Sequence, residues 1–103
     1  MTQKPVVSII IVSWNVRGLL QKCVESIMRF AEIPCEIIIV DNASTDGTAE
    51  YVKKISQVSF GDNILFKAIC NNKNKGFAAA NNQGIAQSIG DYILLLNPDT
   101  EIR

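Results

Sequence analysis

The chain has 103 residues, 48% of them hydrophobic and 19% charged, which is enough for one domain with one modest core. Ten basic and ten acidic residues cancel to a net charge of zero, so the basic surplus typical of nucleic-acid-binding proteins is absent and no nucleic-acid partner is expected. The longest apolar runs, Val6–Val12 and Tyr92–Leu96, are far too short to span a membrane.

The first third of the chain has the pattern of a strand, a helix and a second strand. Val6–Val12 is β-branched and almost continuously apolar, which is typical of a strand buried on both faces of a parallel sheet. From Val16 to Met28, apolar residues recur at the spacing of one helical face. After a turn at Pro34, Ile37–Val40 is predicted to be a second buried strand.

The same alternation continues to the end of the sequence. A second helix is predicted next, with Tyr51 and Val52 on its apolar side. Ile64–Ile69 is a third strand, in which Lys67 indicates an edge position. Tyr92–Leu96 is a fourth strand, predicted to be buried on both faces. A third helix is predicted over about residues 77–89, and its inward side is expected to consist of Phe77, Ala80, Gly84, Ile85 and Ile89.

Four strands alternating with three helices predict an α/β fold with three layers, α/β/α, in which helices cover both faces of a parallel four-stranded sheet. Such sheets bind ligands beyond the carboxyl ends of their strands, where the strand order reverses. Polar clusters follow three of the predicted strands at that edge: Ser13-Trp14-Asn15, Asp41-Asn42 and Asn97-Pro98-Asp99. The pattern therefore predicts a ligand site at the carboxyl edge of the sheet.

The sequence lacks several common means of catalysis and binding. It has no histidine, no G-x-G-x-x-G after the first strand and no P-loop motif. The remaining carboxylates, amides, hydroxyls and single tryptophan suit oxygen-ligated cations and polar nucleotide groups. Cys23, Cys35 and Cys70 fit neither a disulfide framework nor a zinc cluster, so we expect buried free thiols in a cytosolic protein. Attachment of the parent protein to a membrane is compatible with the same pattern.

Two residues at the predicted edge have both a functional and a structural interpretation. Trp14 can stack on a nucleotide base, a contact worth roughly 1–3 kcal/mol, or it can close the rim of the core. Asp41 can accept a hydrogen bond from the imide N–H of uracil or thymine, or its side chain can tie down the following loop. From the residues alone, both interpretations stay open.

Other polar residues near this edge are explained equally well by local structure. Asp99 can bind a divalent cation, with Asn97 adding a neutral carbonyl, or it can belong to an ordinary proline-containing turn. Lys75-Gly76 opens the third helix and can attract phosphate, or it can lie in a surface loop. Four further residues are interpreted as serving a turn and a helix cap: Asn42, Ser44, Thr45 and Asp46. The coincidence of these clusters at one edge favours a nucleotide site.

Four segments together resemble the beginning of family 2 glycosyltransferases: Val7–Asn15, Glu36–Thr48, Asn74–Asn82 and Gly90–Thr100. Their sequences are VSIIIVSWN, EIIIVDNASTDGT, NKGFAAANN and GDYILLLNPDT, and they occur in the order and spacing of the family. The resemblance covers nearly the whole chain. It implies that residues 1–103 form a single domain, the N-terminal nucleotide-sugar-binding half of a bacterial-type enzyme.

The resemblance implies a GT-A fold with strand order 3-2-1-4, and an inverting enzyme that uses a nucleoside-diphosphate sugar and Mn²⁺ or Mg²⁺. It places Trp14 against the base and Asp41 on the imide of the base. Asn97 and Asp99 take the positions of the family's D-x-D motif, with Asp99 as the metal ligand. The other residues implied on the donor side are Ser13, Asn15, Lys75, Gly76 and Phe77, with Asn81 and Asn82 opening towards the pocket.

Two features depart from the family pattern. Asn97 replaces the first aspartate of the D-x-D motif, a variant similar to the branch with many rhamnosyltransferases, which favours a UDP- or dTDP-sugar donor and a polysaccharide or lipid-linked acceptor. The family's catalytic base lies farther along than Arg103, so we assign no catalytic residue and expect this chain alone to be inactive.

Two consequences follow from these departures. The outer edge of Tyr92–Leu96 would be uncovered, which favours a homodimer or a higher oligomer. The missing base also keeps a second interpretation open, namely a non-catalytic nucleotide-binding or interaction module with the same fold. A doubly wound domain of another function is a third interpretation.

Overall fold

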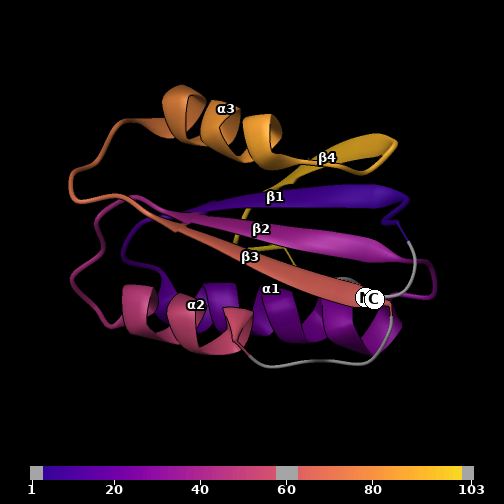
Figure 1. Cartoon of the computed structure of the whole chain (residues 1–103). Helices are drawn as coiled ribbons and strands as arrows, with labels where there is room; N and C mark the ends of the chain where they lie inside the picture. The colour runs from indigo at the N-terminus through magenta and orange to yellow at the C-terminus, as the bar shows by residue number, and fades with distance from the viewer. Residues whose placement is uncertain (1–3, 58–62, 101–103) are drawn as a thin grey trace.

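The computed structural model describes residues 4–57 and 63–100, which form four strands and three helices in strict alternation (Figure 1). The elements in chain order are β1 (Val7–Ser13), α1 (Arg17–Phe30), β2 (Cys35–Asp41), α2 (Thr48–Ser56), β3 (Ile64–Cys70), α3 (Phe77–Gln87) and β4 (Tyr92–Leu96). Each element that the sequence predicts is present, with its ends within two residues of the expected positions. None of the helices in the described ranges is long and apolar enough to cross a membrane.

The strands form one parallel sheet in the order β3-β2-β1-β4, which confirms the predicted topology. Ile9 of β1 lies opposite Ile37 of β2 on one side and Leu94 of β4 on the other. β3 and β4 are the edge strands, so the prediction from Lys67 that β3 lies at an edge is also confirmed. The strand order reverses between β1 and β4, because β2 and β3 are added on one side of β1 and β4 on the other.

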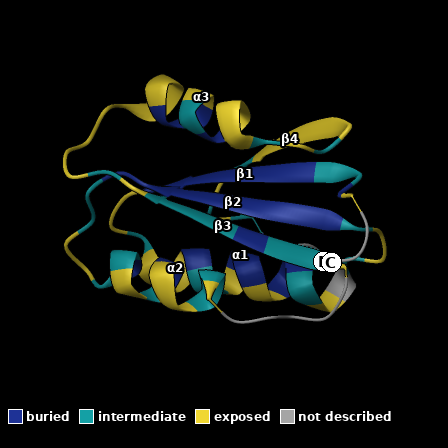
Figure 2. Ribbon diagram, in the orientation of Figure 1, coloured by how far each residue is buried: buried dark blue, intermediate teal, exposed yellow. Residues whose placement is uncertain are grey.

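Helices cover both faces of the sheet, with α1 and α2 on one face and α3 on the other (Figure 1). Alternate residues of β1 and β2 serve the two sides, as the two-residue repeat of a strand requires. Ile9, Ile11, Ile37 and Ile39 belong to the larger cluster, together with Leu20 and Val24 of α1 and Val52 of α2. The smaller cluster beneath α3 consists of Ile10, Val12, Ile38, Val40 and Ala80. Figure 2 shows the two central strands almost entirely buried.

Helix α3 packs through small residues, and this corrects the predicted inward face. Ala80 and Gly84 are buried as expected, but Phe77, Ile85 and Ile89 are exposed, Phe77 by 61%. A Cβ atom on Gly84 would lie only 2.6 Å from Cγ2 of Ile10, so the helix rests directly on β1. This close approach leaves the large apolar residues at the flanks of the helix rather than beneath it.

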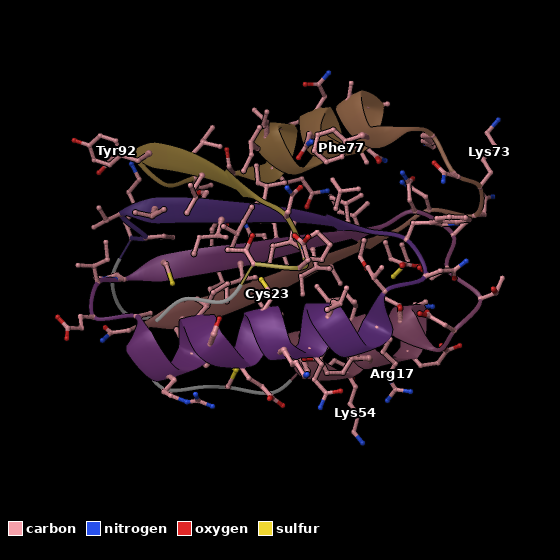
Figure 3. All side chains as sticks on the ribbon, turned by 180° about the vertical axis from the view of Figure 1, so that it is seen from behind. Arg17, Cys23, Lys54, Lys73, Phe77 and Tyr92 are labelled. Carbon is pink, nitrogen blue, oxygen red and sulfur yellow. The ribbon has the colours of Figure 1, made fainter. Side chains whose placement is uncertain are left out.

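Strand β4 is exposed, contrary to the prediction that it is buried on both faces. Its residues Tyr92, Ile93, Leu94 and Leu95 are 68%, 47%, 43% and 49% exposed. The physical reason is its position, because β4 pairs only with β1, and α3 packs over β1 and β2 instead. In Figure 3, the labelled side chain of Tyr92 lies at the end of β4 and that of Phe77 lies on α3.

The three cysteines are free thiols, as predicted, but they are not all buried. Cys23 of α1 and Cys35 of β2 lie in the core. Cys70 is exposed because it is the last residue of the edge strand β3. The prediction of burial is therefore wrong for Cys70.

A buried ion pair fixes the connection between α3 and β4. Glu36 of β2 is fully buried, and its Oε1 lies 2.8 Å from Nζ of Lys67. Its Oε2 accepts hydrogen bonds from the Ser8 hydroxyl at 2.5 Å and from the Ile89 N–H at 2.6 Å. The Ser8 hydroxyl oxygen in turn accepts the Gly90 N–H at 2.8 Å. These contacts hold residues 89–90 against the amino ends of β1 and β2.

The pKa of Glu36 reflects opposing influences of this environment. Burial raises the pKa, but hydrogen bonds from the Ile89 N–H, the Lys67 ammonium and the Ser8 hydroxyl outweigh it. The net effect holds the pKa of Glu36 below its ordinary value of 4.5. The carboxylate is therefore charged at neutral pH and paired with Lys67.

Candidate active site

The predicted polar residues gather at one edge of the sheet, because all four strands run in the same direction. This edge carries the loops after β1, β2 and β3 and the segment after β4, and it lies on the left in Figure 1. The register sets Ser13 opposite Asp41, so the loops after β1 and β2 begin side by side. This is also where the strand order reverses, the position at which such sheets bind ligands.

Asp41 ties down its own loop. The residue is 1% exposed, and its Oδ1 accepts the Ser44 hydroxyl at 2.5 Å while its Oδ2 accepts the Ser44 N–H at 3.2 Å. The structural interpretation of this carboxylate is therefore confirmed. A contact with a nucleotide base stays a prediction, and it would use a lone pair that the two Ser44 contacts leave on the carboxylate.

Asn15 joins the first loop to the second. Its Oδ1 accepts the Thr45 N–H at 2.7 Å, and its own N–H donates to the Ser44 hydroxyl oxygen at 2.8 Å. Asn15 has a φ of +53°, in the left-handed region that asparagine tolerates better than most residues. Its side-chain oxygen is thus engaged within the protein, and a direct contact of Asn15 with the donor nucleotide stays a prediction.

Asp46 caps two helices at once, which confirms its predicted role. Its Oδ2 accepts the Arg17 N–H at the start of α1 at 3.0 Å. Its Oδ1 accepts the N–H of Thr48 at 3.1 Å and also the Thr48 hydroxyl at the start of α2. The Thr48 hydroxyl, supported by these backbone donors, lowers the pKa of Asp46 below its ordinary value of 3.8.

Trp14 and Ser13 are neighbours in the chain with opposite exposure. Trp14 is 53% exposed at the end of β1, so part of its ring is accessible at the edge of the sheet. Ser13 is fully buried, and its hydroxyl has no hydrogen-bond partner among the residues that the structure describes. Trp14 is therefore accessible for stacking, whereas a direct role for the Ser13 side chain requires a ligand to reach below the surface.

The segment before α3 has a conformation that requires glycine. Gly76 has φ +85° and ψ 165°, a combination that only glycine adopts without strain. Its N–H donates to Oδ1 of Asn74 at 2.8 Å, and its carbonyl oxygen accepts the Ala80 N–H at 3.2 Å. Lys75 is exposed beside it, at the positive end of the helix dipole.

The segment after β4 forms the predicted turn. The Thr100 N–H donates to the Asn97 carbonyl oxygen at 3.0 Å, and Asp99 is exposed between them. Because Leu96 lies opposite Ile11, the next residue, Asn97, lies beside the last residues of β1. The described part of the chain holds no group of three or more histidine, cysteine or acidic residues that could hold a metal ion, so Asp99 offers a single carboxylate.

Comparison with known proteins identifies the family. Residues 8–103 match the family described as glycosyl transferase family 2. The chain belongs to glycosyltransferase family 2. This family 2 chain is 30% identical over 93 residues to the glycosyltransferase GlyA of Streptococcus pneumoniae, an alignment that covers 90% of the chain and 13% of GlyA. Among curated relatives such as these, the chain spans between 9% and 36% of the relative's length.

Solved structures show that the family 2 chain has the GT-A fold. The mannosyltransferase PcManGT of Pyrobaculum calidifontis, in complex with GDP-Man and Mn²⁺, matches with a TM-score of 0.80 and 23% identity over 95% of the chain and 28% of PcManGT. TarS of S. aureus, residues 1–349 in complex with UDP-GlcNAc, matches with a TM-score of 0.76 and 23% identity over 90% of the chain and 26% of TarS. At this identity the likeness establishes the fold of this family 2 chain.

Two residues of this family 2 chain have roles that the sequence pattern does not reveal. Asn42 was expected to serve its own turn, but its side chain contacts the segment before α3, more than thirty residues later. Glu36 directly precedes the predicted strand Ile37–Val40, whereas the observed strand β2 begins at Cys35 and includes it. The available signal was a charge adjoining a strand predicted to be buried on both faces, because a buried charge requires a partner.

Proposed function

We propose that this chain is the donor-binding part of an inverting glycosyltransferase that uses a UDP- or dTDP-sugar. The acceptor in this proposal is a polysaccharide or a lipid-linked glycan. One observation carries the proposal: an accessible Trp14, the Asp41 loop, the Lys75-Gly76 segment and the Asn97–Asp99 turn all follow strands at the same edge of the sheet. Membership of glycosyltransferase family 2 supports it.

Each residue has a chemical task in this proposal. Trp14 stacks on the base, and Asp41 accepts the imide N–H that uracil and thymine carry but adenine lacks. Lys75 and the backbone at the start of α3 attract the diphosphate. Ser13 and Asn15 shape the loop beneath the base, and Asn97 offers its amide beside the diphosphate. The free thiols support a cytoplasmic location, with or without attachment of the parent protein to a membrane.

Asp99 is the residue we propose as ligand of Mn²⁺ or Mg²⁺. Within the described ranges, no hydrogen bond or ion pair occupies its carboxylate, and the residue is exposed. A cation held by one carboxylate together with phosphate oxygens and water fits the preferences of Mg²⁺. When bound, the cation would neutralise charge on the diphosphate leaving group.

Nucleotide titration tests the proposal. We expect the chain to bind UDP or dTDP in the presence of Mn²⁺ or Mg²⁺, and we expect Asp41→Ala and Asp99→Ala each to weaken binding by roughly tenfold. Calorimetry measures the affinity, and removal of the cation should weaken the wild-type chain but not Asp99→Ala. Asp91→Ala is the control, because Asp91 is an exposed aspartate that pairs with Lys4 at the other end of β4. Absence of binding by the folded wild-type chain would count against donor binding.

A non-catalytic nucleotide-binding module of the same fold is the alternative function. It is favoured by the engagement of the acidic residues Glu36, Asp46 and Asp91 in structural contacts, which leaves none of them as a general base. We expect the chain alone not to transfer sugar. Turnover with a nucleotide sugar and a glycan or lipid-linked acceptor would remove this alternative.

We also propose that this chain forms a homodimer through β4. Within the described residues the outer edge of β4 is unpaired, and the strand has no charged residue. Two copies can therefore pair in antiparallel orientation with Leu94 opposite its counterpart. A largely apolar groove of about 260 Å³ between α1 and β4, lined by Ile27, Ile33 and Leu94 among others, extends the same surface. A second copy would cover both features.

Light scattering tests the dimer. We expect a mass of about twice 11.3 kDa for the wild-type chain and of one chain for Leu95→Lys, because lysine on an edge strand opposes pairing. Leu19→Lys is the matched control, since Leu19 on α1 is 47% exposed and Leu95 is 49% exposed. A monomeric wild-type chain at high concentration would overturn the proposal.

A further inference from the structure

The side chain of Asn42 connects the end of β2 to the segment before α3. It is 2% exposed, and its Oδ1 accepts the Lys75 N–H at 3.1 Å. Its Nδ2 donates to the Gly76 carbonyl oxygen at 3.2 Å. One amide group therefore accepts from one residue and donates to the next, which an ionised carboxylate cannot do because it only accepts.

The contact fixes the start of α3 as well as the loop. The Gly76 carbonyl oxygen accepts a second bond from the Ala80 N–H, the first bond of the helix. Gly76 also has the glycine-only conformation described above, and a Cβ atom built there would meet no atom within 4 Å beyond its chain neighbours. Asn42 and the Asn74 side chain, which accepts the Gly76 N–H, thus restrain the backbone at this glycine.

A second amide pair anchors Asn42 itself. Nδ2 of Asn71 donates to Oδ1 of Asn42 at 3.1 Å and to Oε1 of Gln83 at 2.8 Å. Nε2 of Gln83 returns a hydrogen bond to Oδ1 of Asn71 at 2.9 Å. This chain of three neutral amides runs from β2 to the second turn of α3, and its members hold one another in place.

The same residue adjoins the proposed base contact. Asn42 follows Asp41 directly, and its backbone N–H donates to the Ser13 carbonyl oxygen at 2.8 Å. The base side of the site and the diphosphate side, at Lys75 and Gly76, are therefore linked through one buried residue. Because Asn42 is buried, its side chain acts on the site through the loop that it holds.

We propose that Asn42 is a positioning residue that sets the diphosphate-binding segment relative to the base-binding loop. This inference rests on the proposed function. It predicts that loss of the amide frees Lys75 and Gly76 while leaving the contacts of Trp14 and Asp41 with the base in place. The defect should therefore appear for ligands that carry the diphosphate and not for the nucleoside alone.

The test compares Asn42→Ala with the wild-type chain in two measurements. We expect faster hydrogen exchange of the Lys75 amide by NMR, and roughly tenfold weaker binding of UDP or dTDP with little change for uridine or thymidine. Asn42→Asp keeps the oxygen that accepts the Lys75 N–H but loses the donor to the Gly76 carbonyl oxygen, so it should restore slow exchange only in part. Asn72→Ala is the matched control, because Asn72 is exposed in the same loop and its side chain makes no hydrogen bond within the described residues.

The outcomes separate this inference from the proposed function. If the wild-type chain binds UDP and Asn42→Ala binds it equally well, the inference is overturned and the proposed function stands. Equal losses for the diphosphate and the nucleoside also overturn it, because they indicate general destabilisation. If the folded wild-type chain binds no nucleotide, the proposed function fails and the inference fails with it.

Discussion

Replacement of Glu36 by alanine is expected to lower the free energy of unfolding by about 1–3 kcal/mol, the usual cost of leaving a buried hydrogen-bonding group without its partner. The substitution leaves Lys67 without its carboxylate partner and the Ile89 N–H without an acceptor. Small domains have a total stability of about 5–15 kcal/mol, so the loss is large. Urea unfolding followed by circular dichroism measures it, through the midpoint and the slope of the transition.

Two further variants sharpen the prediction for Glu36. Glu36→Gln keeps an oxygen that can accept the Ile89 N–H, so its cost should lie between wild type and Glu36→Ala. Glu25→Ala removes an exposed glutamate that accepts a hydrogen bond from Gln21 on the same helix, and should change stability by less than about 0.5 kcal/mol. A loss for Glu36→Ala no larger than that for Glu25→Ala would contradict a structural role of the ion pair.

The pKa of Glu36 also fixes how its contribution depends on pH. Because the folded-state pKa lies below the ordinary value of 4.5, the contribution is fully present above pH 4.5 and is lost as the pH falls through the folded-state pKa. The difference in stability between wild type and Glu36→Gln should therefore shrink at acidic pH. Urea unfolding repeated between about pH 7 and pH 3 measures this difference.

Substitution of Gly90 by alanine is expected to cost about 3 kcal/mol, the upper part of the usual range for overpacking. A Cβ atom on Gly90 would lie 2.6 Å from the Ser8 hydroxyl oxygen, 2.7 Å from the Ser8 nitrogen and 2.9 Å from the Val7 carbonyl carbon. Two of these are backbone atoms of the central strand β1, which cannot shift without disturbing the sheet on both sides. The Gly90–Ser8 hydrogen bond would be strained as well.

Gly18→Ala is the matched control for Gly90. A Cβ atom on Gly18 of α1 meets no other atom within 4 Å, and alanine favours a helix over glycine. This variant should be neutral or more stable by up to about 1 kcal/mol. Chemical denaturation of both variants under the same conditions provides the comparison, and an equal response of the two glycines would contradict the close approach of residue 90 to β1.

Much of the architecture was predictable because it follows from local patterns. Strands buried on both faces, such as residues 37–40 within β2, are continuous runs of β-branched residues. A strand with one face in solvent shows alternating apolar and polar residues instead. Helices such as α1 have an apolar stripe at helical spacing. Four parallel strands then bring their carboxyl ends to one edge, so the location of the candidate site follows from the order of the elements.

The errors occurred where packing distance, rather than pattern, decides burial. Phe77 and Ile85 are apolar at helical spacing, yet α3 approaches β1 through Gly84 so closely that larger residues are displaced to its flanks. Leu94 and Leu95 resemble core residues, but β4 is an edge strand and they stay 43% and 49% exposed. Hydrophobic pattern records which residues favour burial, whereas exposure depends on which elements are adjacent.

The sequence by itself determined the α/β class, the positions of the elements, the edge at which polar residues collect and, through its motifs, the family. Only the tertiary structure decided the partners of individual polar groups. The Asp41 carboxylate binds Ser44, the Asn42 amide reaches Lys75 and Gly76, and Glu36 meets Lys67 inside the protein. The pairings of Asn42 and Glu36 join residues far apart in the chain. All of these contacts depend on differences in distance of a few tenths of an ångström, which no periodicity encodes.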